Sequence, residues 1–271
     1  MILVVAAGAN DTADICARLD QLGAGAPSIA APSERRRLVL ATVDNPAEAG
    51  RVAELLRDEG YAAIARPADG PALEAWMRHT QPIRVGGRLT VCFAWSEHDC
   101  DDSPGLIELG PGGFGNGEHP TTRMLLEVLI ERVHGGERVL DVGCGTGVLG
   151  LGALELGASR VTAVDLKPEA IAATRRNAAW NAMGQRVDAT VEPLHTIAGS
   201  FDAIVANIGR GAAVELAPQL RRLLRPGGWL AVSGISPSQC SLIAGFLRPL
   251  VEVDQRTSGE WAAVVLAQDD Q

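Results

Sequence analysis

The stretch "LDVGCGTGVLG", residues 140–150, decides the fold of this chain. An apolar run with the character of a β-strand leads into glycines at positions 143, 145 and 147, and a second apolar run follows them. A glycine-rich turn that joins a strand to a helix is the binding element of nucleotide-binding α/β folds, because glycine lets the backbone approach a ligand closely. The sequence therefore predicts a strand, a binding turn and a helix in that order.

Strand-like and helix-like segments alternate from residue 121 to the end of the chain. Such alternation predicts an α/β fold with a parallel, doubly wound sheet. The last two strand-like runs, "VEVDQR" and "WAAVVLA", are joined by only "TSGE", which is too short for a crossover, so this pair must be an antiparallel hairpin. We expect seven strands, of which the five before the hairpin cover residues 138–142, 160–165, 187–191, 201–207 and 229–234, and helices over 121–133, 148–156, 168–182, 212–224 and 238–248.

The first 67 residues carry a different pattern, β-α-β-β-α-β, which is the element order of a small ferredoxin-like α+β domain. The second helix of this domain has Asn45 as its predicted N-cap and Pro46 at its first position. We therefore expect a ferredoxin-like domain over 1–67, a linker and bridging segment over 68–109, and the ligand-binding domain over 110–271. The bridging segment contains one predicted strand, "RLTVCFAW" at 88–95, followed by an acidic turn.

Composition limits the class of protein and of partner. The chain has 271 residues and a formal net charge of −9, which favours a basic partner or a small ligand over direct contact with nucleic acid. Five cysteines without CxxC or regular spacing argue against a disulfide framework or a metal site, and for a reducing compartment. The apolar N-terminal run fits a strand rather than a signal peptide, and no run is long enough to span a bilayer. We expect a soluble, cytoplasmic protein without membrane contact.

Two cofactors match the glycine turn. "GTGVLG" fits the GxGxxG fingerprint of dinucleotide sites, and Asp165 follows at about the 20-residue distance of that fingerprint. However, Asp141 stands two residues before Gly143, and its carboxylate would repel a pyrophosphate bound at the start of the next helix. S-adenosylmethionine has no phosphate, and its sulfonium and ammonium groups suit a carboxylate. The sequence favours S-adenosylmethionine, with a nicotinamide dehydrogenase as the alternative.

Polar residues at the ends of predicted strands give the expected site its chemistry, because ligands bind at the carboxyl ends of such strands. Asp165 is placed to accept both ribose hydroxyls, or else to cap the following helix. Glu192 is placed to accept from the adenine amino group, or else is an ordinary loop acid. Asn207 is a candidate catalytic residue that orients an acceptor amine, or else a turn-forming residue. The glycines that would admit the cofactor are Gly143, Gly145 and Gly147.

Several segments together resemble the PrmA family: "GFGNGEHPTTRMLLEVL", "VLDVGCGTGVLGLGALELGA", "VTAVDLKPEAI", "NAAWN" and "FDAIVANI". Members of that family are S-adenosylmethionine-dependent methyltransferases that act on lysine side chains and the N-terminal amine of ribosomal protein L11. The resemblance implies the methyltransferase form of the doubly wound sheet and a basic ribosomal protein as substrate. It also implies that the domain over 1–67 recognises this substrate.

The resemblance assigns site residues as well. Residues 114–122 match the loop that folds over the cofactor, with Phe114 available to cover it. His119 is the only histidine inside a motif, so it is a candidate catalytic residue, or else a loop-stabilising one that bonds the backbone. Thr121 or Thr122 is expected to cap the helix that follows. The positions that match the family's cofactor-binding residues are Thr122, Gly143, Asp165 and Asn207.

Two departures from the family pattern bear on what the site binds. Asn116 stands where the family usually has Thr, which keeps a short polar group, so cofactor binding should survive. "ANIGRGAA" has Gly209 and Arg210 where the family continues with a bulky apolar residue. This leaves the methyl acceptor open between an amine of the ribosomal protein and an amine of another protein or a small molecule. A non-catalytic binding module that keeps the fold is a further alternative.

Overall fold

The computed structural model describes residues 1–7, 11–30, 37–72, 75, 81–94, 96, 100, 102–110 and 115–268. The chain forms two compact units. One comprises Met1–Ile83 with Thr90–Pro111, and the other comprises Arg84–Leu89 with Gly112–Gln271. The segment expected as a linker and bridge, 68–109, therefore contributes residues to both units.

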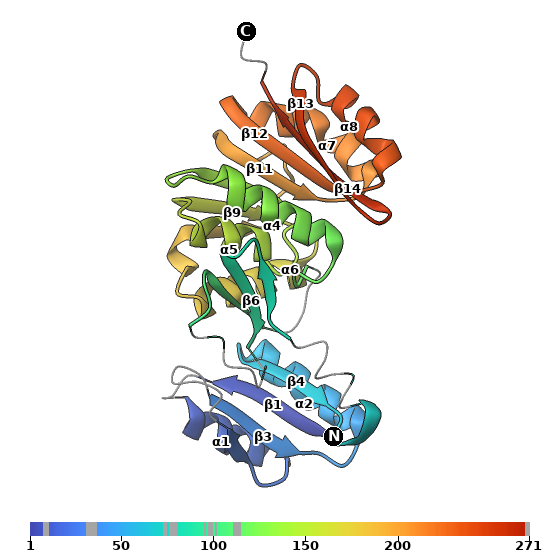
Figure 1. Ribbon diagram of the computed structural model, residues 1–271. Coiled ribbons are helices and arrows are strands. Elements are labelled where there is room, and N and C mark those ends of the chain that lie inside the picture. The colour runs from blue at the N-terminus through green and yellow to red at the C-terminus, as the bar shows by residue number, and fades with distance from the viewer. Residues whose placement is uncertain are drawn as a thin grey trace. The chain divides into compact units, whose positions relative to one another are not determined.

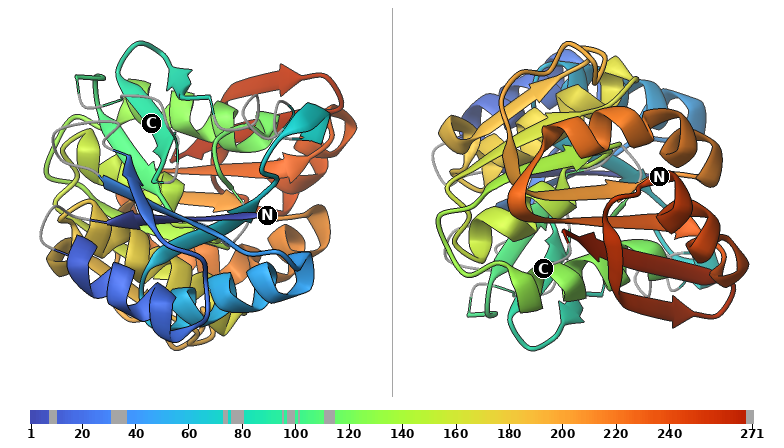
Figure 2. Two further views of the ribbon diagram at one scale, coloured as in Figure 1. Left: turned by 90° about the horizontal axis from the view of Figure 1, so that it is seen from below. Right: turned by 90° about the horizontal axis from the view of Figure 1, so that it is seen from above.

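The first unit contains a four-stranded antiparallel sheet with the order β2-β3-β1-β4. Two helices, α1 and α2, lie along the same face of this sheet (Figures 1 and 2). The β-α-β-β-α-β order agrees with the sequence-based expectation for residues 1–67. The elements are β1 (Ile2–Ala7), α1 (Thr12–Gln21), β2 (Ser28–Ala30), β3 (Arg37–Thr42), α2 (Pro46–Asp58) and β4 (Ala62–Arg66).

Apolar side chains at alternate strand positions and at helical spacing make the core of this sheet and its helices. Leu3 and Val5 of β1 belong to one buried cluster with Leu19 of α1 and Leu56 of α2. Asn45 caps α2 as predicted, because its side-chain oxygen accepts a hydrogen bond of 2.8 Å from the Ala47 N–H. The N-cap that the sequence predicted for α2 is therefore confirmed.

A short three-stranded sheet with the order β5-β6-β7 follows. Its strands are β5 (Ile83–Val85), β6 (Leu89–Phe93) and β7 (Leu106–Leu109), and β6 pairs in parallel with β7. The sequence predicted β6 but missed β5 and β7. Strands of three and four residues are too short to show the alternation on which such a prediction rests.

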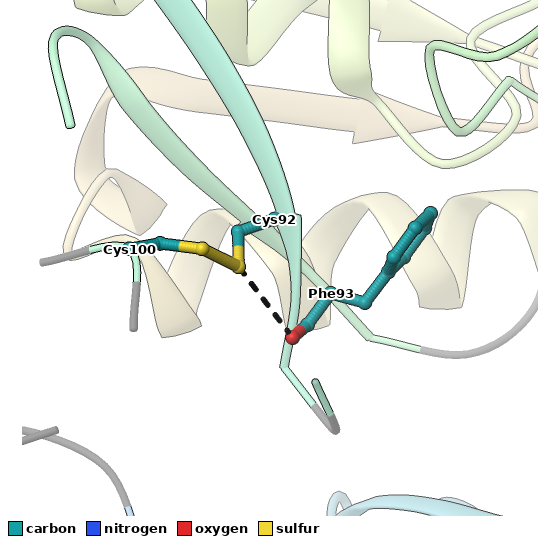
Figure 3. Close-up of a disulfide and its surroundings, with 3 residues drawn as sticks. All are labelled: Cys92, Phe93 and Cys100. Atoms are coloured by element: carbon teal, nitrogen blue, oxygen red, sulfur yellow. Dashed lines mark hydrogen bonds between the residues drawn. A yellow bond between two sulfur atoms is a disulfide. The ribbon is translucent and has the colours of Figure 1, made fainter. Parts of the chain in front are cut away.

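Cys92 on β6 and Cys100 form a disulfide, with their Cα atoms 6.6 Å apart (Figure 3). The sequence argued against a disulfide framework and did not predict this single cross-link, while Cys16, Cys144 and Cys240 are free. The expectation relied on regular spacing, which a single cross-link does not need. The chain must pass beside β6 again to form the parallel strand β7, and Cys100 lies on that return path.

The second unit is built on a seven-stranded sheet with the order β10-β9-β8-β11-β12-β14-β13. Strands β8 to β12 run parallel, and β14 pairs antiparallel with both β12 and β13. This confirms the doubly wound, seven-stranded sheet with an antiparallel C-terminal hairpin. The strands are β8 (Arg138–Val142), β9 (Arg160–Val164), β10 (Val187–Thr190), β11 (Phe201–Asn207), β12 (Leu224–Ile235), β13 (Val251–Ser258) and β14 (Trp261–Ala267).

Helices cover both faces of this sheet (Figure 2). On one face α4 packs against α5, and on the other α7 packs against α8 over a buried apolar cluster. The chain moves from β8 outward to β9 and β10, then returns to β11 on the other side of β8, so the sheet has its switch point between β8 and β11. The helices are α4 (Pro120–Arg132), α5 (Val148–Glu155), α6 (Pro168–Trp180), α7 (Arg210–Leu223) and α8 (Cys240–Phe246).

Most element boundaries in this unit differ by one or two residues from the sequence-based expectation, and two elements differ more clearly. β12 begins at Leu224 rather than Trp229, because Leu224 already pairs with Phe201 before a register shift. The last predicted helix is shorter, since Pro237–Gln239 forms a 3₁₀ turn ahead of α8. Within the part of the chain that the structure describes, no helix is long and apolar enough to cross a bilayer.

A substitution at Phe201 tests how much the apolar core of the seven-stranded sheet contributes to stability. Its side chain is fully buried at the start of β11, and the Arg138 guanidinium lies 5.5 Å from its ring centroid. Phe201→Ala should lower the free energy of unfolding by about 3–5 kcal/mol, because it leaves a cavity in the core. Urea unfolding measures the change. Phe246→Ala is the matched control, since that ring is 48% exposed, and an equal loss in both variants would contradict this description of the core.

Candidate functional site

The turn between β8 and α5 has a backbone that only glycine adopts easily. Gly143, Gly145 and Gly147 all have positive φ angles, of 74°, 56° and 82°. A Cβ on Gly143 would lie 2.7 Å from the Ile208 side chain, and one on Gly147 would lie 2.9 Å from the Thr174 side chain. Both the backbone angles and the lack of space therefore require glycine here.

Asp165 holds this turn from the end of the neighbouring strand β9. Its Oδ2 accepts a hydrogen bond of 3.1 Å from the Gly145 N–H, and its Oδ1 accepts one of 3.0 Å from the Lys167 N–H. Lys167, not Asp165, is the N-cap residue of α6. The carboxylate therefore braces both the glycine turn and the start of α6.

Helix α6 holds the same turn from beneath with two buried polar side chains. The Thr174 hydroxyl donates to the Gly145 carbonyl at 3.2 Å, and the Asn177 amide donates to the Thr146 carbonyl at 2.8 Å. The sequence analysis missed both roles, although "NAAWN" begins at Asn177. The available signal was two polar residues three apart on a helix whose other inward positions are small and apolar.

Asp141 is buried below the glycine turn. Its Oδ2 accepts a hydrogen bond of 3.0 Å from the Gly150 N–H, while its Oδ1 is buried without a hydrogen-bond partner. Burial raises the pKa of the Asp141 carboxyl to about 7. Burial likewise raises the pKa of the Cys144 thiol to about 12, so this cysteine is a small turn residue and not a nucleophile.

Asn207 ends β11 on the opposite side of β8 from Asp165. Its Nδ2 donates a hydrogen bond of 3.2 Å to the Oγ1 of Thr122, which is buried in the first turn of α4. Two residues that lie 85 positions apart in the chain thus meet at the switch point of the sheet. The sequence had placed both among the candidate cofactor-binding residues.

Gly115, in the glycine-rich stretch that precedes α4, contacts the glycine turn between β8 and α5. The Thr146 hydroxyl donates a hydrogen bond to the Gly115 carbonyl, which ties the two segments together. Asn116 closes a local turn, since its Oδ1 accepts from the Glu118 N–H at 3.1 Å. Phe114, the residue expected to cover the cofactor, lies outside the described residues.

His119 is the N-cap of α4. Its Nδ1 accepts a hydrogen bond of 3.4 Å from the Thr121 N–H and lies 2.7 Å from the Thr121 Oγ1. The ring also meets the Trp261 indole edge-on, with 5.0 Å between the centroids. The expectation that Thr121 or Thr122 caps this helix was wrong, because Pro120 occupies the first helical position and makes the preceding histidine the cap. These contacts agree with the alternative interpretation of His119, in which its side chain stabilises the loop by bonding the backbone.

A cavity of about 740 Å³ lies at the carboxyl ends of β8, β9 and β11. Four of the predicted site residues line this cavity: Gly143, Gly145, Asp165 and Asn207. The other predicted residues with described positions do not line it, namely Asp141, Gly147, His119, Thr122 and Glu192. Glu192 is exposed, and so are Gly209 and Arg210 at the start of α7. No group of His, Cys, Asp and Glu suited to a metal ion occurs among the residues with described positions. The lining residues are Gly143, Gly145, Asp165, Lys167, Glu169, Ala170 and Asn207.

Comparisons with known proteins agree with this geometry. A family model described as ribosomal protein L11 methyltransferase (PrmA) matches residues 51–269. The ribosomal protein L11 methyltransferase of Thiobacillus denitrificans is 40% identical over 227 residues, which cover 79% of this chain and 75% of that protein. That of Pelobacter propionicus is 40% identical over 199 residues, and these cover 70% of this chain but only 64% of the relative's length.

A solved structure has the same fold. It is the ribosomal protein L11 methylase from Lactobacillus delbrueckii subsp. bulgaricus, with a TM-score of 0.64 and 30% sequence identity. The match covers 69% of this chain and 98% of that one.

The raised pKa of Asp141 predicts a specific dependence of stability on pH. Between about pH 4 and pH 7 the folded protein keeps a proton on Asp141 that the unfolded chain has released, so the free energy of unfolding should fall as pH rises through this window. Above pH 7 this contribution levels off. The total change is up to about 4 kcal/mol.

Asp141→Asn should flatten this slope, because the amide does not titrate. Urea unfolding of both proteins at half-unit steps from pH 5 to pH 8 measures the effect. Asp188→Asn serves as the control, since this residue is exposed on β10. If Asp141→Asn leaves the slope unchanged, the carboxyl does not titrate in this window.

Proposed function

Because this chain belongs to the PrmA family of ribosomal protein L11 methyltransferases, we propose that it transfers methyl groups from S-adenosylmethionine to amines of ribosomal protein L11. The observation that carries the proposal is the cavity at the switch point, with Asp165 on one side and Asn207 on the other. The matched regions cover 64% of the length of some of the curated relatives, so substrate and activity are proposed for this chain from its family and from the cavity together.

The residues around the cavity fit S-adenosylmethionine. The side chains of Asp165 and Glu169 line it. Carboxylates favour the sulfonium and ammonium groups of this cofactor and disfavour a pyrophosphate. A nicotinamide dinucleotide is therefore the poorer fit.

Each side chain then has a defined task. Asp165 is oriented by two backbone N–H groups and accepts the ribose hydroxyls. The glycine turn, which has no side chains at positions 143, 145 and 147, would admit the methionine part of the cofactor. Asn207, held by Thr122, orients the acceptor amine at the end of β11. When bound, S-adenosylmethionine supplies the methyl group on its sulfonium, so the protein mainly has to align the acceptor and exclude water.

The acceptor amine must lose its proton before it can attack. A lysine ammonium has a reference pKa of about 10.4, and an apolar or cationic environment lowers it. We assign no general base, because His119 is engaged as the N-cap of α4. Phe114 covering the bound cofactor remains a prediction of the family resemblance.

We further propose that residues 1–67 act as a ferredoxin-like substrate-recognition domain and that residues 110–271 bind the cofactor. The antiparallel order β2-β3-β1-β4 supports the first assignment. The net charge of −9 favours a basic protein substrate over direct binding to nucleic acid. Action on a ribosomal protein implies a cytoplasmic location.

An acceptor other than L11 is the second candidate, because of one observation. A Cβ on Gly209 would have no heavy atom within 4 Å, and Arg210 beside it is exposed. The family's bulky apolar residue is absent at this point near Asn207. A different protein or a small-molecule amine would use the same cofactor site, and labelled-methyl transfer into fractionated cell extract distinguishes these acceptors.

Asp165→Ala tests the cofactor site. The variant loses the oxygens that accept the ribose hydroxyls and the brace on Gly145, so the affinity for S-adenosylmethionine should fall roughly tenfold to a hundredfold. Calorimetric titration measures it, with the exposed Asp188→Ala as control. Equal affinity in Asp165→Ala and the unchanged chain would refute this role.

The chain without substitutions should also transfer labelled methyl groups to purified L11. A chain that binds the cofactor but labels nothing in L11 would refute L11 as the acceptor.

Thr122→Val tests the link between the two sides of the site. Valine keeps the shape but removes the hydroxyl that accepts from Asn207, so kcat should fall about two- to tenfold while the free energy of unfolding changes little. Initial rates with L11 measure this. Thr196→Val is the matched control in an exposed loop. Unchanged kcat and KM in Thr122→Val would show that the bond does not position Asn207.

A further inference from the structure

A second cavity lies in the same unit at the amino-terminal edge of the seven-stranded sheet. Its volume is about 350 Å³, and it shares no lining residue with the cavity at the carboxyl edge. α4 ends at Arg132, before β8 begins, and Trp229 pairs with Ala203 near the start of β11. The residues that line this cavity are Glu131, Arg132, His134 and Trp229.

Arg132 brings a positive charge without a partner to this cavity. Its Nε is buried and has no hydrogen-bond partner, and within the described part of the chain its guanidinium makes no ion pair. The adjacent Glu131 also lines the cavity, but in the described structure its carboxylate pairs with Arg256 and not with Arg132. Arg256 also pairs with Asp254 at 3.0 Å and Glu127 at 4.0 Å. A partly buried cation without a counter-charge is costly, so an anion bound here would be stabilised.

Trp229 gives the cavity a planar wall. The indole is only partly exposed, and among the residues with known positions it stacks on no other ring. A planar guanidinium binds a carboxylate or phosphate with two parallel hydrogen bonds, and an indole face packs against an aromatic ring. At about 350 Å³ the cavity is near the lower end of the range for ligand pockets, which suits a ligand with a single ring.

We propose that this cavity binds a small aromatic anion, in which a carboxylate or phosphate is attached to one planar ring. The anionic group pairs with Arg132, the ring lies against Trp229, and His134 lines the mouth as a further hydrogen-bonding group. The proposal goes beyond methyl transfer and does not depend on it, because none of these residues contributes to the cavity between Asp165 and Asn207.

The test is titration of the full chain with benzoate and phenyl phosphate, followed by NMR of the Trp229 indole N–H. We expect saturable shifts with both anions, weaker binding of inorganic phosphate, and no binding of benzylamine. Arg132→Met should weaken both aromatic anions by roughly tenfold or more. Trp229→Leu, followed through backbone amides near residue 132, should weaken benzoate but leave inorganic phosphate unchanged.

Two matched controls separate this site from general charge effects and from the other cavity. Arg160→Met removes an exposed arginine at the start of β9, the same edge of the sheet, and should leave both affinities unchanged. Asp165→Ala should also leave them unchanged. The proposal is overturned if neither aromatic anion binds, if benzylamine binds equally well, or if correctly folded Arg132→Met keeps the original affinity.

Discussion

The glycine turn between β8 and α5 has positive φ angles, and hydrogen bonds and close contacts from neighbouring elements keep it in this conformation. Asp165 fixes the Gly145 N–H, and Thr174 and Asn177 of α6 fix the next two carbonyl groups on its other side. Ile208, which follows β11, lies where a side chain on Gly143 would be. Residues that follow β9 and β11, together with α6, therefore determine the shape of this loop. The loop in turn borders the cavity at the carboxyl ends of the strands.

This dependence explains why some features were predictable from the sequence. β8 and β11 were predicted to the residue, because each is a mostly apolar run whose end is marked by a polar residue or a following glycine. Asp165 and Asn207 were expected at the same edge of the sheet because they lie at strand ends, and both line the cavity there. The remaining features depend on contacts between distant segments. The disulfide to Cys100 leaves no periodic signal, and the spacing of Thr174 and Asn177 shows only that they share a helix face, not which turn they bond. His119 replaced a threonine as the helix cap because Pro120 follows it.

The glycine turn after β8 is in contact with the glycine-rich stretch that precedes α4. The two meet where Thr146 bonds the Gly115 carbonyl. α4 starts a few residues later and delivers Thr122 to Asn207. A change in the segment before α4 can therefore reach Asn207 through Thr122 without touching the glycine turn.

The position of β14 has a consequence for how the protein is made. This strand is the last of the sheet in chain order, yet it lies inside the sheet, between β12 and β13. During synthesis on a ribosome, β12 is finished first and has an open edge until residues 261–267 emerge and pair with it. An open edge of apolar residues is a template for pairing with other chains. The sheet can therefore close only after β14 has been made, long after the glycine turn between β8 and α5 is complete.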